Sequence, residues 1–378
     1  MQVLLEPSIL RVWSLWLPLS QSAYISRSGR RAKEGAKQLK AVTIRPPNLL
    51  SVEEVSVPHV GADELLVEMK VCGLCGTDVE KLRGQYTASM PVLGHEAVGA
   101  VAEVGASLRG FKPGERVFPH HHVACRRCYF CSHGNESMCR RYRESNLDPG
   151  GFSEYIRVPA WNVRKGGVLK LPEHVTYEEA SFIEPLACCI RALDRVGVNK
   201  DEVVLVVGAG PLGVTHALLL RGLGASPMVS DVNEGRLRFA ESTFGLSTLN
   251  AAKRDVPKDV RSETRGRGAD LAIVASGNPK ALEQALRSVR KGGRVCLFGV
   301  PPKGSRLDYD ISDLFNSELS VISSYAATEK ETRRALELIA SGRLQLSRMV
   351  THVYPLERFE DAVRTFEKGA CMKVLVVP

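Results

Sequence analysis

The sequence lacks the long apolar run that a membrane protein requires, because none of its runs approaches the roughly 20 residues needed to span a bilayer. Internal repeats are also absent, and low-complexity sequence is confined to a basic N-terminal stretch. No basic stripe with interleaved aromatic residues is present in the body of the chain. The composition, with 44% hydrophobic and 25% charged residues, is typical of a soluble globular protein. We therefore predict neither a membrane nor a nucleic acid as a partner.

The positive charge of the chain is concentrated at its N-terminus. The formal charge is +9, and residues 1–40 account for +5 of it, with seven Lys and Arg residues against Glu6 and Glu34. The rest of the chain carries only +4, so the charge says little about function.

Residues 1–38 also differ in composition from the rest of the chain. The apolar run Ile9–Leu19 is short and interrupted by Arg11, and a stretch rich in Ser, Arg and Gly follows it. A targeting peptide fits this composition, whereas a secretory signal is disfavoured because no basic region precedes the apolar run. We favour a disordered extension at residues 1–38, a folded body that begins near Leu39, and a cytoplasmic location.

A compact group of cysteines follows the spacing C-x2-C-x2-C-x7-C, at Cys125, Cys128, Cys131 and Cys139. Four thiolates at this spacing can surround one tetrahedral Zn²⁺ and leave no open position, which describes a structural metal site. Basic side chains that should help keep these thiols deprotonated lie beside them, at Arg126, Arg127, Arg140 and Arg141. A pair of disulfides is the alternative, and it is disfavoured because nothing else argues for an oxidising compartment.

The length of 378 residues favours two domains, and the first has the pattern of a β protein. From Lys40 to about Ile183, short β-forming runs separated by Gly and Pro predict a barrel-like all-β unit. Strands are expected at Leu65–Val71, Val98–Val104, Arg116–Phe118 and Tyr155–Val158.

The second domain alternates strands and helices. The continuous run Val203–Val207 predicts a buried parallel strand, and a helix is expected from the following glycines to Leu223. Further elements are expected at Pro227–Ser230, Leu271–Ala275, Pro279–Arg290 and Arg294–Phe298. This alternation predicts βαβ units in an open parallel sheet with helices on both faces. After Glu329 we expect two amphipathic helices and a terminal strand, Val374–Val377.

A glycine-rich turn follows the first strand of the second domain. Gly208 permits a sharp turn, Gly210 lets the backbone approach a pyrophosphate, and Gly213 lets helix and strand pack closely. Asp231 ends the next strand, where a carboxylate can bind an adenosine ribose and repel a 2′-phosphate, so NAD is favoured over NADP. Arg236 weakens this preference, because a nearby arginine can accommodate that phosphate.

A second group of metal ligands lies in the first domain. One thiolate, one imidazole and one carboxylate are three zinc ligands with a fourth position open, which is the pattern of a catalytic site. The candidates are Cys75, His95 and a glutamate, either Glu96 or Glu184. Taken singly, each has a structural interpretation as a buried thiol, a core histidine or a surface acid.

Taken together, these motifs resemble the zinc-dependent medium-chain alcohol dehydrogenases, closest to the sorbitol (polyol) dehydrogenase branch. The matching stretches are GLCGTD (73–78), PVLGHEAVG (91–99), the cysteines of 125–139, IEPL (183–186), GAGPLG (208–213) and GGRVCLFG (292–299). The resemblance implies an α/β protein with a GroES-like β-barrel catalytic domain plus a Rossmann doubly wound parallel-sheet nucleotide domain. The catalytic domain would span 39–186, the nucleotide domain 187–326, and residues 327–378 would return to complete the catalytic domain.

The resemblance also implies the reaction and the roles of the site residues. A secondary alcohol of a polyol or sugar would be oxidised at a zinc on Cys75 and His95, with hydride transfer to NAD⁺. Thr77 would pass the alcohol proton onward, and Asp78 would orient His95. The cofactor would also contact Leu212, Phe298, Gly299, Val300 and Tyr325. A homodimer or homotetramer is expected.

The sequence departs from the pattern of the polyol branch in several places. Glu80 stands where a histidine often continues the proton path, and Ala326 stands where sorbitol dehydrogenases place an arginine. The run His120–His122 predicts either a polar wall of the substrate pocket or a solvated turn. Weaker pocket candidates are Ser145 and Asn146. Cysteines without ligand spacing, expected to be buried thiols, are Cys188, Cys189, Cys296 and Cys371.

Two alternatives stay open at this point. Within the same family, the substrate could be an L-threonine-type amino alcohol or a simple alcohol, although Glu184-Pro185-Leu186 argues against the threonine enzymes. From another class, a non-catalytic dinucleotide-binding or zinc-ribbon protein would share the glycine turn and the four cysteines.

Overall fold

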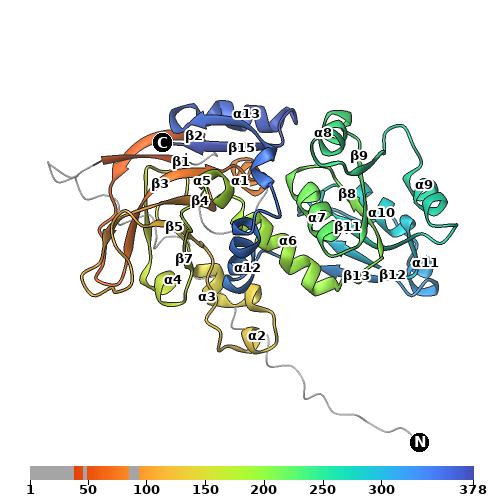
Figure 1. The fold of residues 1–378 in the computed structure, drawn as a ribbon, viewed down its shortest axis with the longest axis horizontal. Helices are drawn as coiled ribbons and strands as arrows, with labels where there is room; N and C mark the ends of the chain where they lie inside the picture. Colours follow the sequence, from red (N-terminus) through yellow and green to blue (C-terminus); the bar gives the residue numbers. More distant parts are fainter. Residues whose placement is uncertain (1–37, 46–48, 85–92) are drawn as a thin grey trace, which may run out of the picture. The chain divides into compact units, whose positions relative to one another are not determined.

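The computed structural model describes residues 38–45, 49–84 and 93–378 (Figure 1). The extension predicted at 1–38 therefore lies outside the described residues, except for its last residue. The first described element is β1 (Gln38–Arg45), which pairs in antiparallel fashion with β2 (Leu49–Ser56). Leu39 is buried within β1.

The first domain is built on one large sheet, which has seven strands within the described ranges. The strand order is β14-β15-β3-β4-β5-β7, and β6 pairs with β3. The strands are β3 (Leu65–Gly73), β4 (Glu96–Val104), β5 (Arg116–Pro119), β6 (Tyr155–Val158), β7 (Val168–Lys170), β14 (Val350–Pro355) and β15 (Lys373–Val377). The C-terminal strand β15 pairs with β3, so the end of the chain lies beside the beginning of this sheet.

The second domain contains the parallel sheet, which has six strands in the described part of the chain, in the order β10-β9-β8-β11-β12-β13. Its strands are β8 (Val203–Val207), β9 (Ser226–Asp231), β10 (Ser247–Asn250), β11 (Ala269–Val274), β12 (Val289–Leu297) and β13 (Ser320–Ser323). The strand order reverses between β8 and β11, which is where open α/β sheets bind their ligands. The β-branched residues of β8 are almost all buried, because helices cover both faces of this sheet.

Helices connect the consecutive strands of the parallel sheet. They are α7 (Pro211–Gly222), α8 (Glu234–Phe244), α9 (Val256–Glu263), α10 (Pro279–Ser288) and α11 (Ile311–Asn316). The predicted helix Pro279–Arg290 is two residues too long, because Val289 and Arg290 already belong to β12.

The remaining helices belong to the first domain or join it to the second. They are α1 (Gly76–Leu82), α2 (Tyr129–Ser132), α3 (Arg140–Glu144), α4 (Ala160–Arg164), α5 (Tyr177–Ala180), α6 (Ile183–Val196), α12 (Glu329–Ala340) and α13 (Phe359–Glu367), with short 3₁₀ turns at η1 (Glu136–Met138), η2 (Leu346–Met349) and η3 (Leu356–Arg358). In the part of the chain that the structure describes, no helix is long and apolar enough to cross a membrane.

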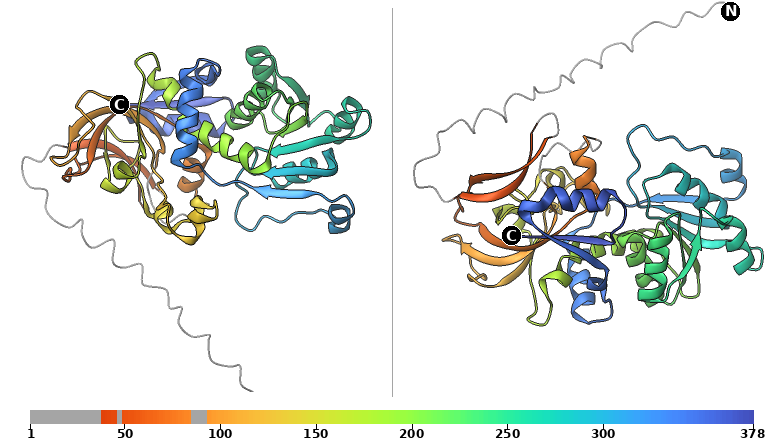
Figure 2. Two further views of the ribbon diagram at one scale, coloured as in Figure 1. Left: turned by 60° about the horizontal axis from the view of Figure 1, so that its bottom comes forward. Right: turned by 90° about the horizontal axis from the view of Figure 1, so that it is seen from above.

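Helix α6 links the two sheets (Figures 1 and 2). One continuous hydrophobic core contains Val71 and Phe118 of the first sheet, the buried face of α6, and Val204 and Ile273 of the parallel sheet. The predicted boundary between residues 186 and 187 falls inside this helix. Because α6 packs against both sheets, side chains from the two domains can meet at one site.

The prediction for the C-terminal segment was incomplete. Helices α12 and α13 and the terminal strand are present, but the sequence analysis missed β14 (Val350–Pro355). The side chains of β14 alternate between half-buried and exposed positions, so this edge strand has only a weak apolar signal.

Candidate active site and metal centres

The first cluster of possible metal ligands lies where β3 and β4 meet helix α1. Cys75 precedes the first residue of α1, and His95 directly precedes β4. The Asp78 carboxylate is fully buried and accepts hydrogen bonds from the backbone N–H of Cys75 (3.1 Å) and of Gly94 (3.0 Å). Its Oδ1 atom also lies 3.3 Å from Nδ1 of His95. Asp78 therefore holds the two segments that carry Cys75 and His95 in a fixed relation.

Gly94 is required for this arrangement. Its φ of +79° lies in the left-handed region, and a Cβ atom at this position would lie 2.6 Å from the backbone nitrogen of Phe152. The neighbouring His95 is thus presented by a turn that only glycine can form.

The side chains of Cys75, His95 and Glu96 form a set with the composition of a zinc site. One ligand atom from each lies within 4.8 Å of the others. Burial lowers the pKa of His95, but Asp78 and the Cys75 sulfur outweigh burial and hold that pKa well above its usual range. Such a site attracts positive charge, and its thiolate, imidazole and carboxylate donors are those that Zn²⁺ prefers. The residues therefore fit a zinc ion.

Glu184, the other candidate acid, lies apart from this set. It belongs to the first turn of α6, is buried, and accepts a hydrogen bond from the Cys188 thiol at 3.3 Å. Burial raises the pKa of Glu184, and the nearby Glu96 raises it further, whereas His95 lowers it. Within the described residues it does not join the three clustered ligands, although it lines the same cavity.

Lys373, which the sequence did not single out, contacts the candidate metal site. Its buried ammonium donates hydrogen bonds to Oε2 of Glu96 and, at 3.3 Å, to the carbonyl oxygen of Leu74. Burial lowers the pKa of Lys373, but Glu96 and Cys75 raise it above its usual value. One feature of the sequence could have pointed to it: Lys373 begins β15, whose other residues are all apolar. A charge in such a strand is buried on folding and needs an oppositely charged partner.

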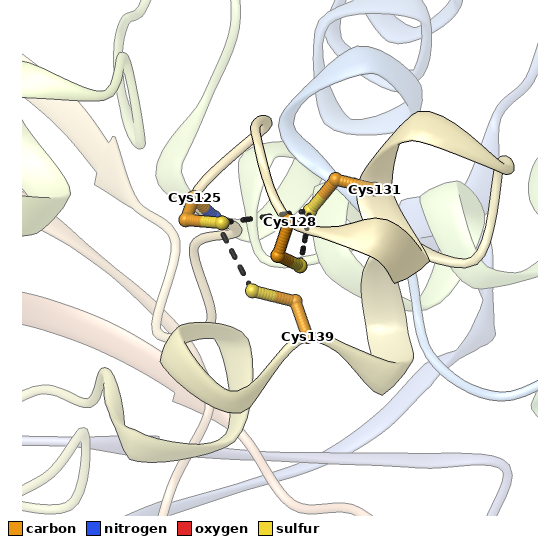
Figure 3. Close-up of side chains that lie close together, drawn as sticks. All are labelled: Cys125, Cys128, Cys131 and Cys139. Carbon is orange, nitrogen blue, oxygen red and sulfur yellow. Dashed lines mark hydrogen bonds between the residues drawn. The ribbon is translucent and has the colours of Figure 1, made fainter.

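The second cluster consists of Cys125, Cys128, Cys131 and Cys139, whose sulfur atoms lie within 4.8 Å of one another (Figure 3). The Sγ atoms of Cys125 and Cys131 are 3.9 Å apart, and those of Cys128 and Cys131 are 3.6 Å apart. Four thiolates around a tetrahedral zinc would be separated by about 3.8 Å, given Zn–S bonds of about 2.3 Å. All ten cysteines of the chain are described and all are free thiols, so the disulfide alternative is wrong.

Main-chain groups stabilise a thiolate in this cysteine cluster. The backbone N–H of Arg127, followed by that of Cys128, lowers the pKa of the Cys125 thiol to about 6, against the opposing effect of burial. The sequence had suggested the neighbouring arginine side chains for this role. Main-chain N–H groups stabilise the thiolate instead, because the turn after Cys125 directs them at the Cys125 sulfur.

The glycine turn between β8 and α7 has the geometry of a phosphate-binding turn. Gly208 has a φ of +114°, and a Cβ atom on Gly213 would lie 1.8 Å from the carbonyl oxygen of Gly208. Helix α7 begins directly after Gly210, so its free N–H groups point out of the turn. The Asp231 carboxylate accepts hydrogen bonds from the backbone N–H of Ala209 (2.7 Å) and Asn233 (2.8 Å), which places it beside the turn.

A cavity of about 620 Å³ joins the metal-ligand cluster to the nucleotide domain. The expected reactive residues Cys75, Thr77, His95, Glu96 and Glu184 all line it. The expected cofactor residues that line it are Leu212, Phe298, Gly299, Val300 and Tyr325. The other expected cofactor residues, which lie at or beside the glycine turn and do not line the cavity, are Gly208, Gly210, Gly213, Asp231 and Arg236.

Three consecutive histidines form part of the cavity region. His120 and His121 are buried, and His121 and His122 line the cavity. Burial lowers the pKa of His120 to about 3 and that of His122 to about 4, so these rings are neutral at pH 7. His121 and His122 give the cavity a polar lining, whereas the buried His120 does not line it, and the alternative of a solvated turn is wrong. Of the weaker candidates, Asn146 lines the cavity, whereas the Ser145 carbonyl lies 2.9 Å from Nδ1 of His122.

The predictions for the isolated cysteines hold for three of the four. Cys189, Cys296 and Cys371 are buried thiols. Cys188 is only partly buried and lines the cavity, because it follows Glu184 by one helical turn on the exposed side of α6.

Comparison with known proteins assigns the chain to a family. The model of the alcohol dehydrogenase GroES-like domain matches residues 61–173, and the zinc-binding dehydrogenase model matches residues 211–341. Sorbitol dehydrogenase of Bacillus subtilis (strain 168) is 31% identical over 354 residues, which cover 90% of this chain and 98% of that protein. An L-threonine 3-dehydrogenase of Legionella pneumophila (strain Corby) is 32% identical over 336 residues, covering 86% and 95%.

Solved structures show the same relationship. A zinc-binding dehydrogenase from Sinorhizobium meliloti 1021 bound to NADP superimposes with a TM-score of 0.81 at 30% identity, covering 90% of this chain and all of that one. The fold predicted from the sequence, a GroES-like domain with a Rossmann nucleotide domain, is confirmed.

The chain therefore belongs to the zinc-dependent medium-chain alcohol dehydrogenases. It is an oxidoreductase that oxidises an alcohol with zinc and a nicotinamide cofactor. This membership argues against the non-catalytic dinucleotide or zinc-ribbon protein that the sequence left as an alternative.

Proposed function

We propose that this enzyme oxidises a secondary hydroxyl group of a polyol or sugar and transfers the hydride to NAD⁺. The observation that carries the proposal is the shared cavity. It brings the cluster of Cys75, His95 and Glu96 together with Leu212 and Phe298 of the nucleotide domain. A substrate held at the first group can thus face a nicotinamide held at the second.

In this proposal Cys75, His95 and Glu96 hold the catalytic zinc, and the four clustered cysteines hold the structural one. When bound, the catalytic zinc supplies Lewis acidity that lowers the pKa of an alcohol. Asp78 keeps the His95 ring oriented, and Lys373 fixes the Glu96 carboxylate. We prefer Glu96 to Glu184 as a direct ligand because Glu96 alone clusters with Cys75 and His95 among the described residues.

Other residues of the chain handle the proton and the substrate. The Thr77 hydroxyl lines the cavity two residues after Cys75 and can accept the alcohol proton and pass it outward. Glu184, held by the Cys188 thiol, lines the cavity as a second acid. Phe298, Gly299 and Val300 form the side of the cavity where a nicotinamide ring would lie.

The lining of the cavity favours a substrate with several hydroxyl groups. Neutral His121 and His122 and the amide of Asn146 offer hydrogen bonds there. So does the buried hydroxyl of Ser324, which has no hydrogen-bond partner among the described residues. A hydrophobic pocket would discriminate poorly between such substrates and simple alcohols, whereas polar groups reject a substrate that leaves them unpaired.

The substrate class is tested by following NADH formation with sorbitol and other polyols, aldoses, 2-butanol and L-threonine. We expect the highest kcat/KM with a polyol or sugar. If L-threonine or 2-butanol exceeded every polyol and sugar, the proposed substrate class would be wrong, and the amino-alcohol or simple-alcohol alternative would replace it.

The preference for NAD⁺ is tested with the variant Asp231→Ala. Asp231 lies beside the glycine turn, where its charge can accept ribose hydrogen bonds and repel a 2′-phosphate. We expect the ratio of kcat/KM for NAD⁺ to that for NADP⁺ to fall by roughly tenfold or more, because charged hydrogen bonds and a repulsion are both lost. The matched control is Asp194→Ala, which removes an exposed ion pair with Arg334. An unchanged ratio in Asp231→Ala would refute the role.

We also propose a homodimer, formed through the edge of the parallel sheet. Strand β13 ends this sheet, so one side of it has no partner strand within the described residues. Apolar side chains are exposed on or near this edge, at Ile311 (78%), Phe315 (79%) and Val321 (45%). An exposed strand edge with apolar neighbours is a pairing surface, and a second copy can supply an identical edge in antiparallel orientation.

The variant Val321→Lys tests this interface, because it places two like charges where identical edges would meet. We expect light scattering after size-exclusion chromatography to show half the mass of the wild type. Val353→Lys is the matched control, since Val353 is similarly exposed (54%) on the edge strand β14 of the other sheet. A wild-type monomer, or equal dissociation in both variants, would contradict the proposal.

A cytoplasmic location is part of the same proposal. Ten cysteines without a disulfide, and two clusters of possible metal ligands that contain cysteine, suit a compartment that keeps thiols reduced.

A further inference from the structure

The segment Ser324–Ala327, which connects β13 to α12, forms one wall of the cavity. Ser324, Tyr325 and Ala326 line the cavity directly. Ala326 adopts a φ of +56°, which is unfavourable for a residue with a Cβ atom. A backbone in this conformation persists only when the surrounding structure holds it there.

The element that holds this wall is the cysteine lobe, defined as residues 124–142. The Tyr142 hydroxyl donates a hydrogen bond to the carbonyl oxygen of Ala327 at 2.5 Å, and the Tyr142 side chain is fully buried. Ala326 packs against the small hydrophobic core of the lobe, which contains Ala124, Cys125, Cys139 and Tyr142. Two consecutive residues of the wall are thus fixed by the lobe.

A second connection lies at the start of α12. Glu329 is buried, and its Oε1 atom accepts a hydrogen bond from the backbone N–H of Ala124 at 3.1 Å. Its Oε2 atom lies 3.4 Å from the guanidinium of Arg126. A buried carboxylate that pairs with the lobe fixes the helix end that follows the wall.

Tyr142 also contacts another residue of the cavity lining. Its ring lies 4.9 Å, between centroids, from the ring of His122, which lines the cavity. Hence one side chain of the lobe touches both the histidine wall and the segment that carries Tyr325 and Ala326.

We propose that the cysteine lobe positions the substrate-binding wall of the active site, with Tyr142 and Glu329 as the positioning residues. The lobe thereby determines how tightly the substrate binds, in addition to stabilising the fold. The inference rests on the proposed function in one respect, since it takes the cavity as the substrate site.

The variant Tyr142→Phe removes only the hydroxyl and keeps the ring against His122. Because the Ala327 carbonyl would lose its buried partner, the wall should shift, and we expect the KM for sorbitol, or for the panel polyol oxidised fastest, to rise roughly tenfold. The kcat should stay within about twofold, because the wall contacts the non-reacting part of the substrate. Tyr354→Phe is the matched control, since it removes a tyrosine hydroxyl that bonds Thr365 away from the cavity.

A second variant and a second readout keep the test decisive. Glu329→Gln removes the charge that pairs with Arg126, and it should raise the same KM if Tyr142→Phe does not fold. Hydrogen–deuterium exchange of peptides covering residues 322–330 should be faster in the variant than in the wild type and in Tyr354→Phe, with the zinc content unchanged. An unaltered KM or unaltered exchange in a folded variant would overturn the inference. A wild-type enzyme that oxidises no panel substrate would refute the proposed function instead, and the exchange measurement would still decide whether the lobe holds the wall.

Discussion

Replacement of His95 by alanine is expected to lower kcat/KM by at least about a thousandfold, because it removes one of three proposed ligands and with it the Lewis acid of the reaction. The zinc content should fall from about two ions per chain to about one. Because His95 lies at the cavity, the chain should still fold, and its circular dichroism spectrum should match that of the wild type. Metal analysis and steady-state kinetics on the same preparation check both expectations.

A matched control separates this effect from the loss of any imidazole. His352 is partly exposed on β14, and its Nδ1 atom lies 3.0 Å from the hydroxyl of the adjacent Thr351. We expect His352→Ala to retain wild-type activity and both zinc ions. If His95→Ala kept two zinc ions and full activity, the assignment of the catalytic centre would be wrong.

Replacement of Cys139 by serine is expected to lower the melting temperature by roughly 10 °C or more, because a structural zinc supplies folding free energy that the variant loses. Cys139 is buried in the cysteine cluster, where a serine hydroxyl is a poor ligand. Calorimetry together with zinc analysis measures both changes. The catalytic zinc should remain, so the zinc content should again be about one ion per chain.

The control for this variant is Cys371→Ser. Cys371 is also buried, but it belongs to neither metal-ligand cluster among the described residues, and its thiol contacts the carbonyl oxygen of Thr365 at 3.7 Å. We expect its melting temperature to change by only about 2–4 °C. Equal destabilisation of the two variants would show that burial of a thiol, and not metal binding, explains the loss.

The features that the sequence predicted well are those whose residues are close together along the chain. The four cysteines of the lobe lie within 15 consecutive positions, and the glycine turn directly follows a run of buried β-branched residues. The spacing of these residues along the chain was therefore enough to predict that they lie close together in the folded protein. The alternation of strands and helices likewise indicated a parallel sheet, because its period is visible in sequence.

The features that the sequence could not supply depend on distant contacts. Lys373 meets Glu96 across 277 positions, and no local pattern pairs them. The choice between a polar wall and a solvated turn at His120–His122 depended on packing against Tyr142 and neighbouring strands. Similarly, only the folded chain separates Glu96 from Glu184, because only Glu96 reaches the ligand cluster among the described residues.

The pairing of β15 with β3 has a consequence for biosynthesis. The strand that delivers Lys373 to the active site, β15, follows the whole parallel sheet along the chain. A ribosome will have released the whole nucleotide sheet into solution before it synthesises that lysine. The reactive centre is therefore completed late, when β15 enters the sheet between β14 and β3, and until then the Glu96 carboxylate lacks its ammonium partner.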